Sequence, residues 1–562
     1  MKKKDTASLL MFDVASVLIY IFMMLLLETS VLFCFKINIF WGTMPLACIG
    51  AGIVFFALRE NSFKRTVYVI TFSIIIIILA SAISNTYYDR SWDGNAYHKL
   101  AVGLLKNGWN PLWEKPSLEI SEGIGHTDGN VIWCEGYCKG TWIYAASIYA
   151  LVHNIEAGKS YTLIGMITVG SLAYYYLNKK KYANKVIIGG TLLLAINPIA
   201  MQQMDSFYLD GFLHCMIICL VISLMMMQDN DLFDKKISKS LVFSTMIVCG
   251  NIKFTGLLYG GIFCIAFYIY ACVNNFRLIG KIDSAIIERT IFYLILAVTT
   301  VLWAGNLTYL TNVIRHKTLL YPLLGSDSKD IMSGNSPFLE ENHIKNLLVS
   351  LFSYTDNMQR EADGTIDLKI PFTFSIKREL YSIILPDTRI GGFGIFFSGI
   401  FCFAIIGLFI YILKLKKDKD FWLILTVFSC CILLTFGIKE SWWARYAPYI
   451  YIISVVGVLV LVGSNYKFIN KIGFIIMLIL LLNNLLPLIS LPIDIKKSMT
   501  IRSELVEIKA EMPIEVYNDD FPGVYYNFKD SNIKYVINEK LAEEENKQMN
   551  YCETLWRTNV NE

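Results

Sequence analysis

The sequence predicts an all-α protein that spans a membrane many times. Of its 562 residues, 55% are hydrophobic and only 17% are charged, and the mean hydropathy is +0.50. Many of its apolar runs are about 20 residues long, which is the length of helix that crosses a bilayer. Lys and Arg gather in alternate loops between these runs, as they do in multi-pass membrane proteins.

The composition also excludes several other classes of protein. So much apolar surface cannot be buried within a soluble enzyme, and it does not suit a disordered or collagen-like chain. There are 50 Lys and Arg against 46 Asp and Glu, so the net charge of +4 does not indicate a nucleic-acid partner. Most of the 13 cysteines lie in apolar runs and act as small hydrophobic side chains. Cys134 and Cys138 are too few for a zinc site, and free thiols are favoured over a disulfide.

About thirteen segments are predicted to cross the membrane as helices, because a helix pairs its own backbone polar groups. The first follows Lys2–Lys4 and has no cleavage site after it, so we interpret it as a retained anchor. The segments lie near Ser8–Phe35, Phe40–Leu58, Thr66–Ser84, Ser160–Leu177, Val186–Met201, Gly211–Met227, Leu241–Asn251, Gly256–Val273, Thr290–Thr308, Gly391–Leu413, Phe421–Ile438, Ala447–Gly463 and Ile472–Leu491.

The distribution of basic residues predicts the orientation. Short loops rich in Lys and Arg stay in the cytoplasm, so we expect a plasma-membrane protein with a cytoplasmic N-terminus and an external C-terminus. The alternate loops that are predicted to be cytoplasmic contain Lys2–Lys4, Arg59, Lys64, Arg65, Lys179–Lys181, Lys185, Lys235, Lys236, Lys239, Arg277, Lys281, Arg289, Lys414, Lys416, Lys417, Lys419, Lys467 and Lys471. The short loops that are predicted to be external contain only Lys36, Lys253, Lys439 and Arg445.

Three long polar segments are external in this orientation. They divide the chain into an N-terminal hairpin (1–65), a transmembrane core (66–492) with external loops 85–159 and 309–389, and an external appendage (493–562). Two large loops on one side favour a site on the outer face over a simple transporter. The appendage alternates β-type runs with turn residues, which predicts a small α/β unit. These runs are Ile514–Tyr517, Val524–Phe528 and Tyr535–Ile537.

The first external loop places two acids before a predicted helix. Asp89 and Asp93 precede apolar residues that recur at helical spacing over Gly94–Lys106, which predicts an amphipathic helix along the membrane surface. At the start of this helix, Asp93 has the position of an N-cap, which is a common role for Asp. Alternatively, Asp89 and Asp93 form a carboxylate pair at the outer edge of the bilayer. The spacing alone favours the cap.

This loop resembles the first external loop of the GT-C glycosyltransferases, a superfamily that uses polyprenyl-phosphate sugars. It includes protein O-mannosyltransferases, the aminoarabinose transferase that acts on lipid A, and oligosaccharyltransferases. In the same order as in that superfamily, the acids are followed by two surface helices, the second over Gly140–Ala146, and by a crossing helix that ends at Lys179–Lys181. Further short motifs are similar: Asn251–Gly256, Leu320–Leu323, Asp387–Gly394 and Trp442–Tyr446. One departure is that the acidic loop follows the third span, which implies an extra N-terminal hairpin.

The resemblance implies an inverting glycosyl transfer on the outer face of the membrane. A sugar on polyprenyl phosphate has a good leaving group, whereas the acceptor hydroxyl needs a base. Asp93 would be this base or would orient the acceptor, and Asp89 would be its partner or a metal ligand. Tyr97 and His98 would lie near the site.

In the superfamily, an acid of the second external loop often assists the first, in some cases through a divalent cation. Asp205 and Asp210 are the candidates here, and Mg²⁺ or Mn²⁺ would be the cofactor that such carboxylates suit. Each acid could instead cap the next helix, and for Asp210 both interpretations stay open.

Lys253 and Arg445 are the candidates for binding the donor phosphate. Lys253 separates two short apolar segments, and Arg445 follows two tryptophans just outside the bilayer. A charge at membrane depth is costly and marks a functional site, and Arg can bind phosphate through two nitrogens. Both side chains could instead snorkel to the interface. Because its loop is otherwise apolar, Arg445 is the stronger candidate.

The expected partners are therefore a polyprenyl-phosphate sugar donor and a saccharide, lipid or protein acceptor of the cell envelope. Two other functions stay open. A polysaccharide polymerase or ligase would also work outside, with a polyprenyl-diphosphate-linked glycan. A transporter or flippase of the same carriers should have charges throughout its spans, whereas here the charges gather at the outer boundary.

The first prediction concerns orientation. A cysteine introduced into the appendage (493–562) should react with a membrane-impermeant maleimide added to intact cells, because the basic loops all share the opposite side. The unaltered protein, with its native cysteines, gives the background labelling. Reaction only after permeabilisation would reverse the orientation and place the carboxylates on the cytoplasmic side.

Overall fold

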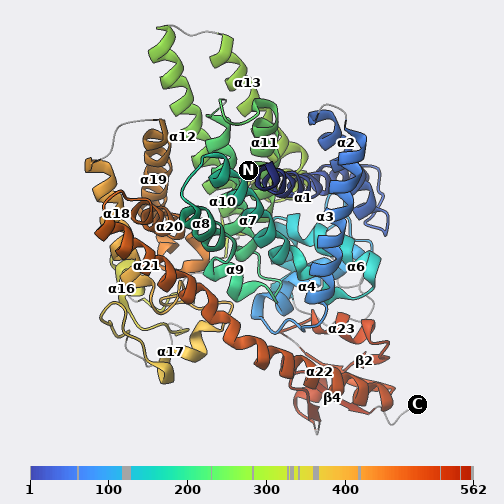
Figure 1. The fold of residues 1–562 in the computed structure, drawn as a ribbon. Coiled ribbons are helices and arrows are strands. Elements are labelled where there is room, and N and C mark those ends of the chain that lie inside the picture. Colours follow the sequence, from blue (N-terminus) through green and yellow to red (C-terminus); the bar gives the residue numbers. More distant parts are fainter. Residues whose placement is uncertain are drawn as a thin grey trace.

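The structure is a computed structural model, mostly helical, with one small sheet near the C-terminus (Figure 1). It describes residues 2–59, 62–116, 128–229, 231–280, 284–325, 328–329, 335–338, 342–358, 366–414, 419–518, 520–544 and 546–558. Parts of both long loops lie outside the described residues, as do Lys281, Lys416 and Lys417 of the basic loops.

A helix occupies each of the segments that were expected to cross the membrane. These helices are α1 (Lys2–Cys34), α2 (Thr43–Leu58), α3 (Phe63–Ser84), α7 (Tyr161–Lys179), α8 (Asn184–Ala195), α10 (Asp210–Met227), α11 (Lys235–Ile252), α12 (Phe254–Ile279), α13 (Ser284–Val298), α18 (Phe397–Lys414), α19 (Lys419–Gly437), α20 (Pro448–Val462) and α21 (Lys467–Leu485). Within the described part of the chain, seven helices are long and apolar enough to cross a membrane. The chain is therefore a membrane protein by this criterion, and the count of thirteen spans stays a prediction.

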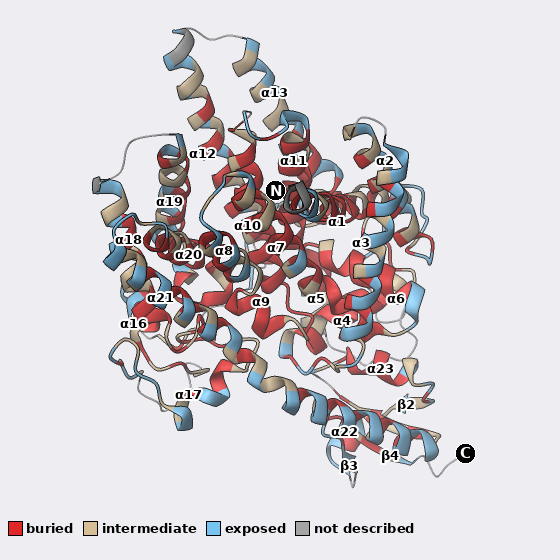
Figure 2. Cartoon of the chain, viewed as in Figure 1, coloured by how far each residue is buried: buried red, intermediate tan, exposed pale blue. Residues whose placement is uncertain are grey.

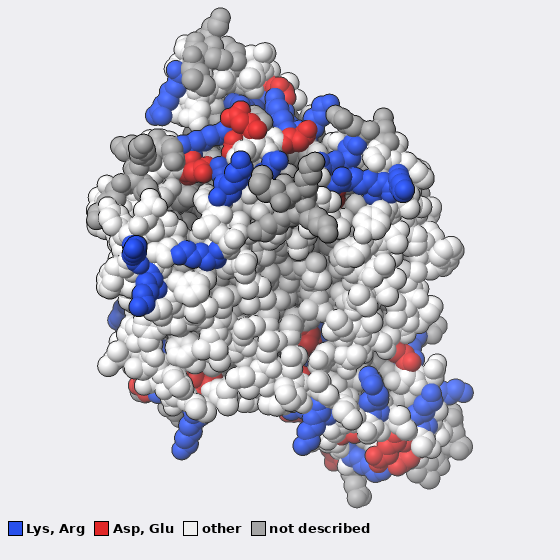
Figure 3. Space-filling model, in the orientation of Figure 1, with Lys and Arg blue, Asp and Glu red and all other residues white. Residues whose placement is uncertain are grey.

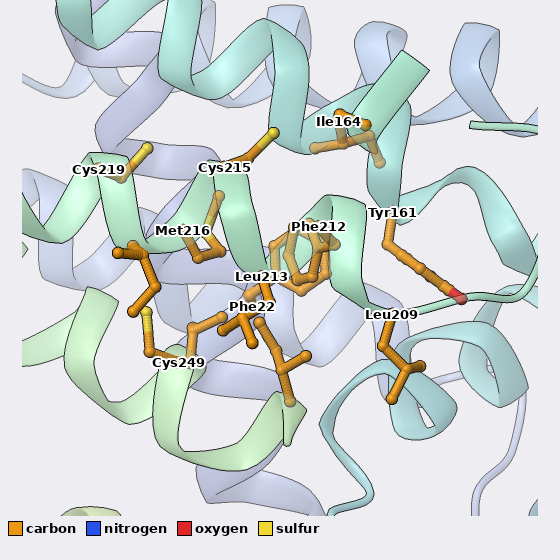
Figure 4. Packing of buried hydrophobic residues seen from close by; sticks show 14 of the residues in the cluster. Phe22, Tyr161, Ile164, Leu209, Phe212, Leu213, Cys215, Met216, Cys219 and Cys249 are labelled. Atoms are coloured by element: carbon orange, nitrogen blue, oxygen red, sulfur yellow. The ribbon is translucent and has the colours of Figure 1, made fainter. Parts of the chain in front are cut away.

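The core lies where α1, α7, α10 and α11 meet, and Figure 2 shows these central helices mostly buried. Phe212 of α10 packs against Phe22 of α1 and Tyr161 of α7, with ring centroids 4.8 and 5.7 Å apart (Figure 4). Gly165 lets α7 approach this closely, because a Cβ there would lie 2.7 Å from the Phe212 ring. Close packing of this kind fixes the relative positions of the helices.

The outer helices expose apolar side chains, as lipid-facing helices do. Large apolar residues of α3 and α13, such as Ile78 and Leu294, are more than half exposed. In Figure 3 a broad uncharged band separates charged residues at the two ends of the molecule. The connection that contains Lys179–Lys181 and the adjoining ends of α12 and α13 lie at one end, and the loops of the predicted external side lie at the opposite end (Figure 1). Which end faces the cytoplasm stays a prediction.

Loop 85–159 forms a compact helical layer at one end of the bundle. It consists of the π-helical turn η1 (Gly94–His98), α4 (Lys99–Lys106), α5 (Asp128–Gly136), α6 (Gly140–Val152) and the 3₁₀ turn η3 (Ile155–Ser160). A helix thus follows Asp93 as predicted, and its place on the membrane surface stays a prediction. Every residue from Lys99 to Leu105 is buried, because α6 and the appendage both pack against this helix.

The appendage contains a four-stranded sheet in the order β2-β1-β4-β3. β1 (Ile514–Tyr517) pairs in parallel with β2 (Tyr535–Ile537) and antiparallel with β4 (Leu555–Thr558), which pairs with β3 (Lys547–Gln548). The predicted strands over Ile514–Tyr517 and Tyr535–Ile537 are confirmed. The predicted strand over Val524–Phe528 is wrong: this segment lies in helix α23 (Val524–Asp530), and all five of its residues are buried rather than alternately exposed.

The last helix of the bundle continues into the appendage. α21 passes through the turn η8 (Leu486–Ser490) into α22 (Leu491–Ala510), which extends away from the bundle in Figure 1. Residues 493–510 therefore form a helix, and the strands follow only from Ile514. The sheet and α23 fold back against loop 85–159, next to the site described below.

Candidate functional site

The site is centred on Arg445, which lies between α19 and α20 in the short turn η7 (Ala444–Tyr446). Its side chain is buried and has three carboxylates around it. Nη1 lies 2.9 Å from an oxygen of Asp387 and 3.3 Å from one of Asp93, and Nε lies 3.8 Å from one of Asp210. These acids come from three segments far apart in the sequence, and Arg445 brings them together.

Lys253 supplies a second cation beside Asp210. Its backbone is extended (φ −159°, ψ 153°), which breaks the helical run between α11 and α12. The Lys253 Nζ donates to Asp210 Oδ1 at 2.8 Å. Asp210 is the first residue of α10, and its two oxygens face Lys253 and Arg445. Its side chain thus takes part in ion pairs, and an assisting role in the chemistry stays a prediction.

Aromatic rings line the cationic side of the site. The guanidinium carbon of Arg445 lies 4.5 to 5.0 Å from the ring centres of Tyr208, Trp443 and Tyr446. The Lys253 ammonium lies 4.0 Å from the centre of the Tyr446 ring. Such contacts stabilise cations that have lost part of their water.

Asp93 faces Arg445 and does not cap the helix that follows it. Its backbone is helical, and its side chain makes no hydrogen bond to the first turn. The Arg445 Nη1 donates to Asp93 Oδ2 at 3.3 Å. The Asp93 side chain is 20% exposed, against 3% for Asp210. Of these two acids, Asp93 is therefore the one that a substrate can reach more easily.

Asp89 has a different environment, although it is only four residues away. It is buried, and its two oxygens accept hydrogen bonds from the backbone N–H groups of Ser91 and Phe207, each at 2.8 Å. Burial raises the pKa of Asp89. These bonds tie loop 85–159 to the loop before α10, so the observed role of Asp89 is to hold two loops together.

Asp205 also lies outside the Arg445 cluster. Burial raises its pKa to about 7, with a further contribution from the charge of Asp494. Its other charged neighbours are Lys159, Asp89 and Arg90. Of the two acids predicted in the second loop, only Asp210 contacts Arg445.

Tyr97 and His98 lie beside the Arg445 cluster, close to the charges of Asp93 and Asp210 respectively. The Tyr97 and His98 ring centres lie 4.3 Å apart, with the ring planes tilted by 47°. Tyr97 also lies close enough to Asp93 for that charge to raise the tyrosine pKa further, beyond the effect of burial. The His98 Nδ1 accepts a hydrogen bond from the Trp142 indole at 2.8 Å. Burial lowers the pKa of His98 to about 3, so it is neutral at physiological pH.

Asp387 and Arg389 are the site residues to which the sequence assigned no role. Burial raises the pKa of Asp387 to about 6, despite the opposing effect of Arg445. The Arg389 Nη2 lies 3.6 Å from Asp387, and its guanidinium carbon lies 5.3 Å from the Trp443 ring centre. The signal that could have found them is an acid and an arginine two residues apart beside a glycine-rich stretch.

Three buried N–H donors of this cluster make no hydrogen bond to the described residues, although Asp210 lies 3.8 Å from one of them, and neither does the acceptor Oδ1 of Asp387. The donors are Nε of Arg389, Nε of Arg445 and Nε1 of Trp443. Buried donors are nearly always hydrogen-bonded in proteins. Since both arginines lie over the Trp443 ring, the three donors belong to one small region. An anionic oxygen is the acceptor that best suits such a set.

The predicted divalent cation does not fit this centre. Asp93, Asp210 and Asp387 converge on the Arg445 guanidinium, which already occupies the position between them. No group of three or more His, Cys, Asp or Glu side chains within the described ranges could hold a metal ion. Cys134 and Cys138 are buried free thiols.

The chain matches no family model, no curated protein and no solved structure. The resemblance to the GT-C glycosyltransferases therefore stays a prediction. What the protein does has to be inferred from the Arg445 site itself.

Proposed function

We propose that the protein is an inverting glycosyltransferase that moves a sugar from a polyprenyl-phosphate carrier to an acceptor of the cell envelope. The acceptor would be a glycan, a lipid-linked saccharide or a protein. The observation that carries the proposal is the set of buried N–H donors of Arg389, Trp443 and Arg445, placed beside the accessible carboxylate of Asp93. The N–H donors suit the phosphate of the sugar donor, and the Asp93 carboxylate suits the hydroxyl of the acceptor.

The cationic part would hold the donor phosphate. Negative charge grows on the phosphate as the bond to the sugar breaks, and donors already aimed at it lower the barrier. A guanidinium is the best side chain for this, because its planar fork matches two phosphate oxygens. Arg445 is itself fixed by Asp387 and Asp210, so its orientation is set before the substrate arrives.

Asp93 would act on the acceptor. It takes the proton of the acceptor hydroxyl as that oxygen bonds to the anomeric carbon, and the electron pair of the breaking carbon–oxygen bond leaves with the phosphate. Attack opposite the leaving group inverts the anomeric centre. A phosphate bound to Arg445 would compete with Asp93 for the same Nη1, which would leave the carboxylate free to act as a base.

The position of the site suits a lipid-linked donor. Asp210 begins α10, Lys253 directly precedes α12, and Arg445 lies three residues before α20. The charged centre is thus level with the ends of apolar helices. A polyprenyl chain could remain among the helices and lipid while its phosphate reaches Arg445.

A polymerase or ligase that uses a polyprenyl-diphosphate-linked glycan is the second candidate. The specific observation in its favour is that Arg389 lies beside Arg445, since two arginines could bind two phosphate groups. Reconstituted vesicles supplied with either a polyprenyl-phosphate hexose or the corresponding diphosphate distinguish the two. Movement of either lipid across the bilayer without sugar transfer would indicate a flippase and contradict both.

The second prediction tests Asp93 as the base. Asp93→Asn keeps the size and polarity of the side chain but cannot accept a proton, so sugar transfer should fall by roughly 10²–10⁴. The measurement is release of polyprenyl phosphate from a polyprenyl-phosphate hexose in reconstituted vesicles. Asp231→Asn, at a carboxylate 93% exposed, is the matched control and should keep full activity. Normal transfer by well-folded Asp93→Asn would remove Asp93 from the mechanism.

The third prediction tests the phosphate contact. Arg445→Lys keeps the positive charge but loses the planar fork, so binding of radiolabelled farnesyl phosphate should weaken about tenfold or more. Equilibrium binding to the detergent-solubilised protein measures this directly, without a sugar. Arg277→Lys, at an exposed position of α12, should leave binding unchanged. Unchanged binding in Arg445→Ala would show that Arg445 only anchors its loop.

A further inference from the structure

The appendage is seated directly on the helix that follows Asp93. Gly103 of α4 and Tyr526 of α23 are in close contact, since a Cβ on Gly103 would lie 1.9 Å from the tyrosine ring. Gly523, just before α23, donates its backbone N–H to the carbonyl of Asn95 at 2.9 Å. The contact therefore reaches the turn η1 itself, two residues from Asp93.

A buried polar network joins the appendage to loop 85–159 beneath this contact. The Lys99 Nζ donates to Glu156 Oε1 and Tyr551 Oη, both at 2.5 Å, and to Asn527 Oδ1 at 3.1 Å. Glu156 also accepts from the Asn527 amide and from the backbone N–H of Asp89. All of these side chains are almost completely buried. Burial alone would raise the pKa of Glu156, but the charges of Lys159 and Lys99 lower this pKa to about 2.

Tyr551 connects this network to the backbone that surrounds Asp93. Its hydroxyl lies 3.1 Å from Asn95 Oδ1 and from Asn527 Oδ1. The amide nitrogen of Asn95 donates in turn to the carbonyls of Asp89 and Ser91, at 2.8 and 2.9 Å. Asn95 thereby holds the segment on both sides of Asp93, and it is itself held by the appendage through Tyr551 and Gly523.

We propose that Tyr551 is a positioning residue that acts through Asn95 to hold Asp93 against Arg445. This inference rests on the proposed function and assigns the appendage a part in it. Among the described residues, the charged partner of Asp93 outside its own segment is Arg445, at 3.3 Å, so the position of Asp93 depends on the turn that carries it. A catalytic group displaced by about 1 Å can lose on the order of a hundredfold in rate.

The fourth prediction is that Tyr551→Phe, which removes only the hydroxyl, lowers the kcat of sugar transfer about tenfold to a hundredfold. Binding of farnesyl phosphate should stay within about twofold of the wild type, because Arg445 keeps its own partners. The matched control is Asp530→Asn. Asp530 fastens the same helix α23 to Tyr149 and to the backbone N–H of Ile155, away from η1, so this variant should keep its kcat.

A double-mutant cycle separates positioning from general destabilisation. If Tyr551 acts through Asp93, Tyr551→Phe should not reduce the residual turnover of Asp93→Asn any further. An equal reduction in both backgrounds would overturn the proposal, as would wild-type kcat in Tyr551→Phe when Asp93→Asn is inactive. Full activity in Asp93→Asn would instead overturn the proposed function and the role of Tyr551 with it.

A second variant keeps the test decisive if Tyr551→Phe does not fold. Gly523→Ala leaves every polar group in place, but its Cβ would lie 2.7 Å from the carbonyl oxygen of Asn95 and would press on the same turn. Its kcat should fall while its melting temperature and farnesyl phosphate binding remain close to those of the wild type. Unchanged kcat would contradict a positioning role for the appendage.

Discussion

The burial of the Arg445 guanidinium is the constraint on which the arrangement around it depends. Removing a charge from water costs several kcal/mol, of the order of the stability of a whole domain, unless other charges and hydrogen bonds replace the water. Asp93, Asp210 and Asp387 provide this replacement, and they come from three different loops. The cluster can form only if all three loops are ordered at the same end of the bundle. The described parts of loop 85–159 therefore fold into a helical layer that carries Asp93, and loop 309–389 places Asp387 beside Arg445.

The same requirement accounts for the irregular backbone at this end of the helices. Lys253 interrupts the path from α11 to α12 with an extended residue, and α10 begins at Asp210 with no cap of its own. A break in a helical run is tolerated where the surrounding protein satisfies the freed polar groups. Here the side chains of the interruption satisfy each other, since Lys253 and Asp210 form an ion pair. The break between α11 and α12 and the Lys253–Asp210 ion pair therefore both follow from the burial of charged groups around Arg445.

The parts of the structure that could be predicted from the sequence are those set by local pattern. Apolar runs located the helices, and alternation located β1 and β2, because both signals depend only on neighbouring residues. No role was assigned to Asp387 from the sequence, because the distance between Asp387 and Arg445 depends on how loop 309–389 folds. The burial of α4 was missed for a related reason: part of its cover comes from Tyr526, a residue more than 400 positions later in the chain. Val524–Phe528 forms a helix because it is packed between the sheet and α4, which its own composition does not reveal.

Asp89 and Asp93 show why spacing could not distinguish the roles of two acids four residues apart. Both precede the same helix, and both resemble caps in the sequence. Two backbone N–H groups occupy the oxygens of Asp89, so that carboxylate has no exposed lone pair for a substrate. Asp93 pairs with the Arg445 cation, within the part of the chain that the structure describes, and keeps part of its surface open. A rigid acid thus supports the loop from which an accessible one projects, and a chemical role for Asp93 depends on the structural role of Asp89.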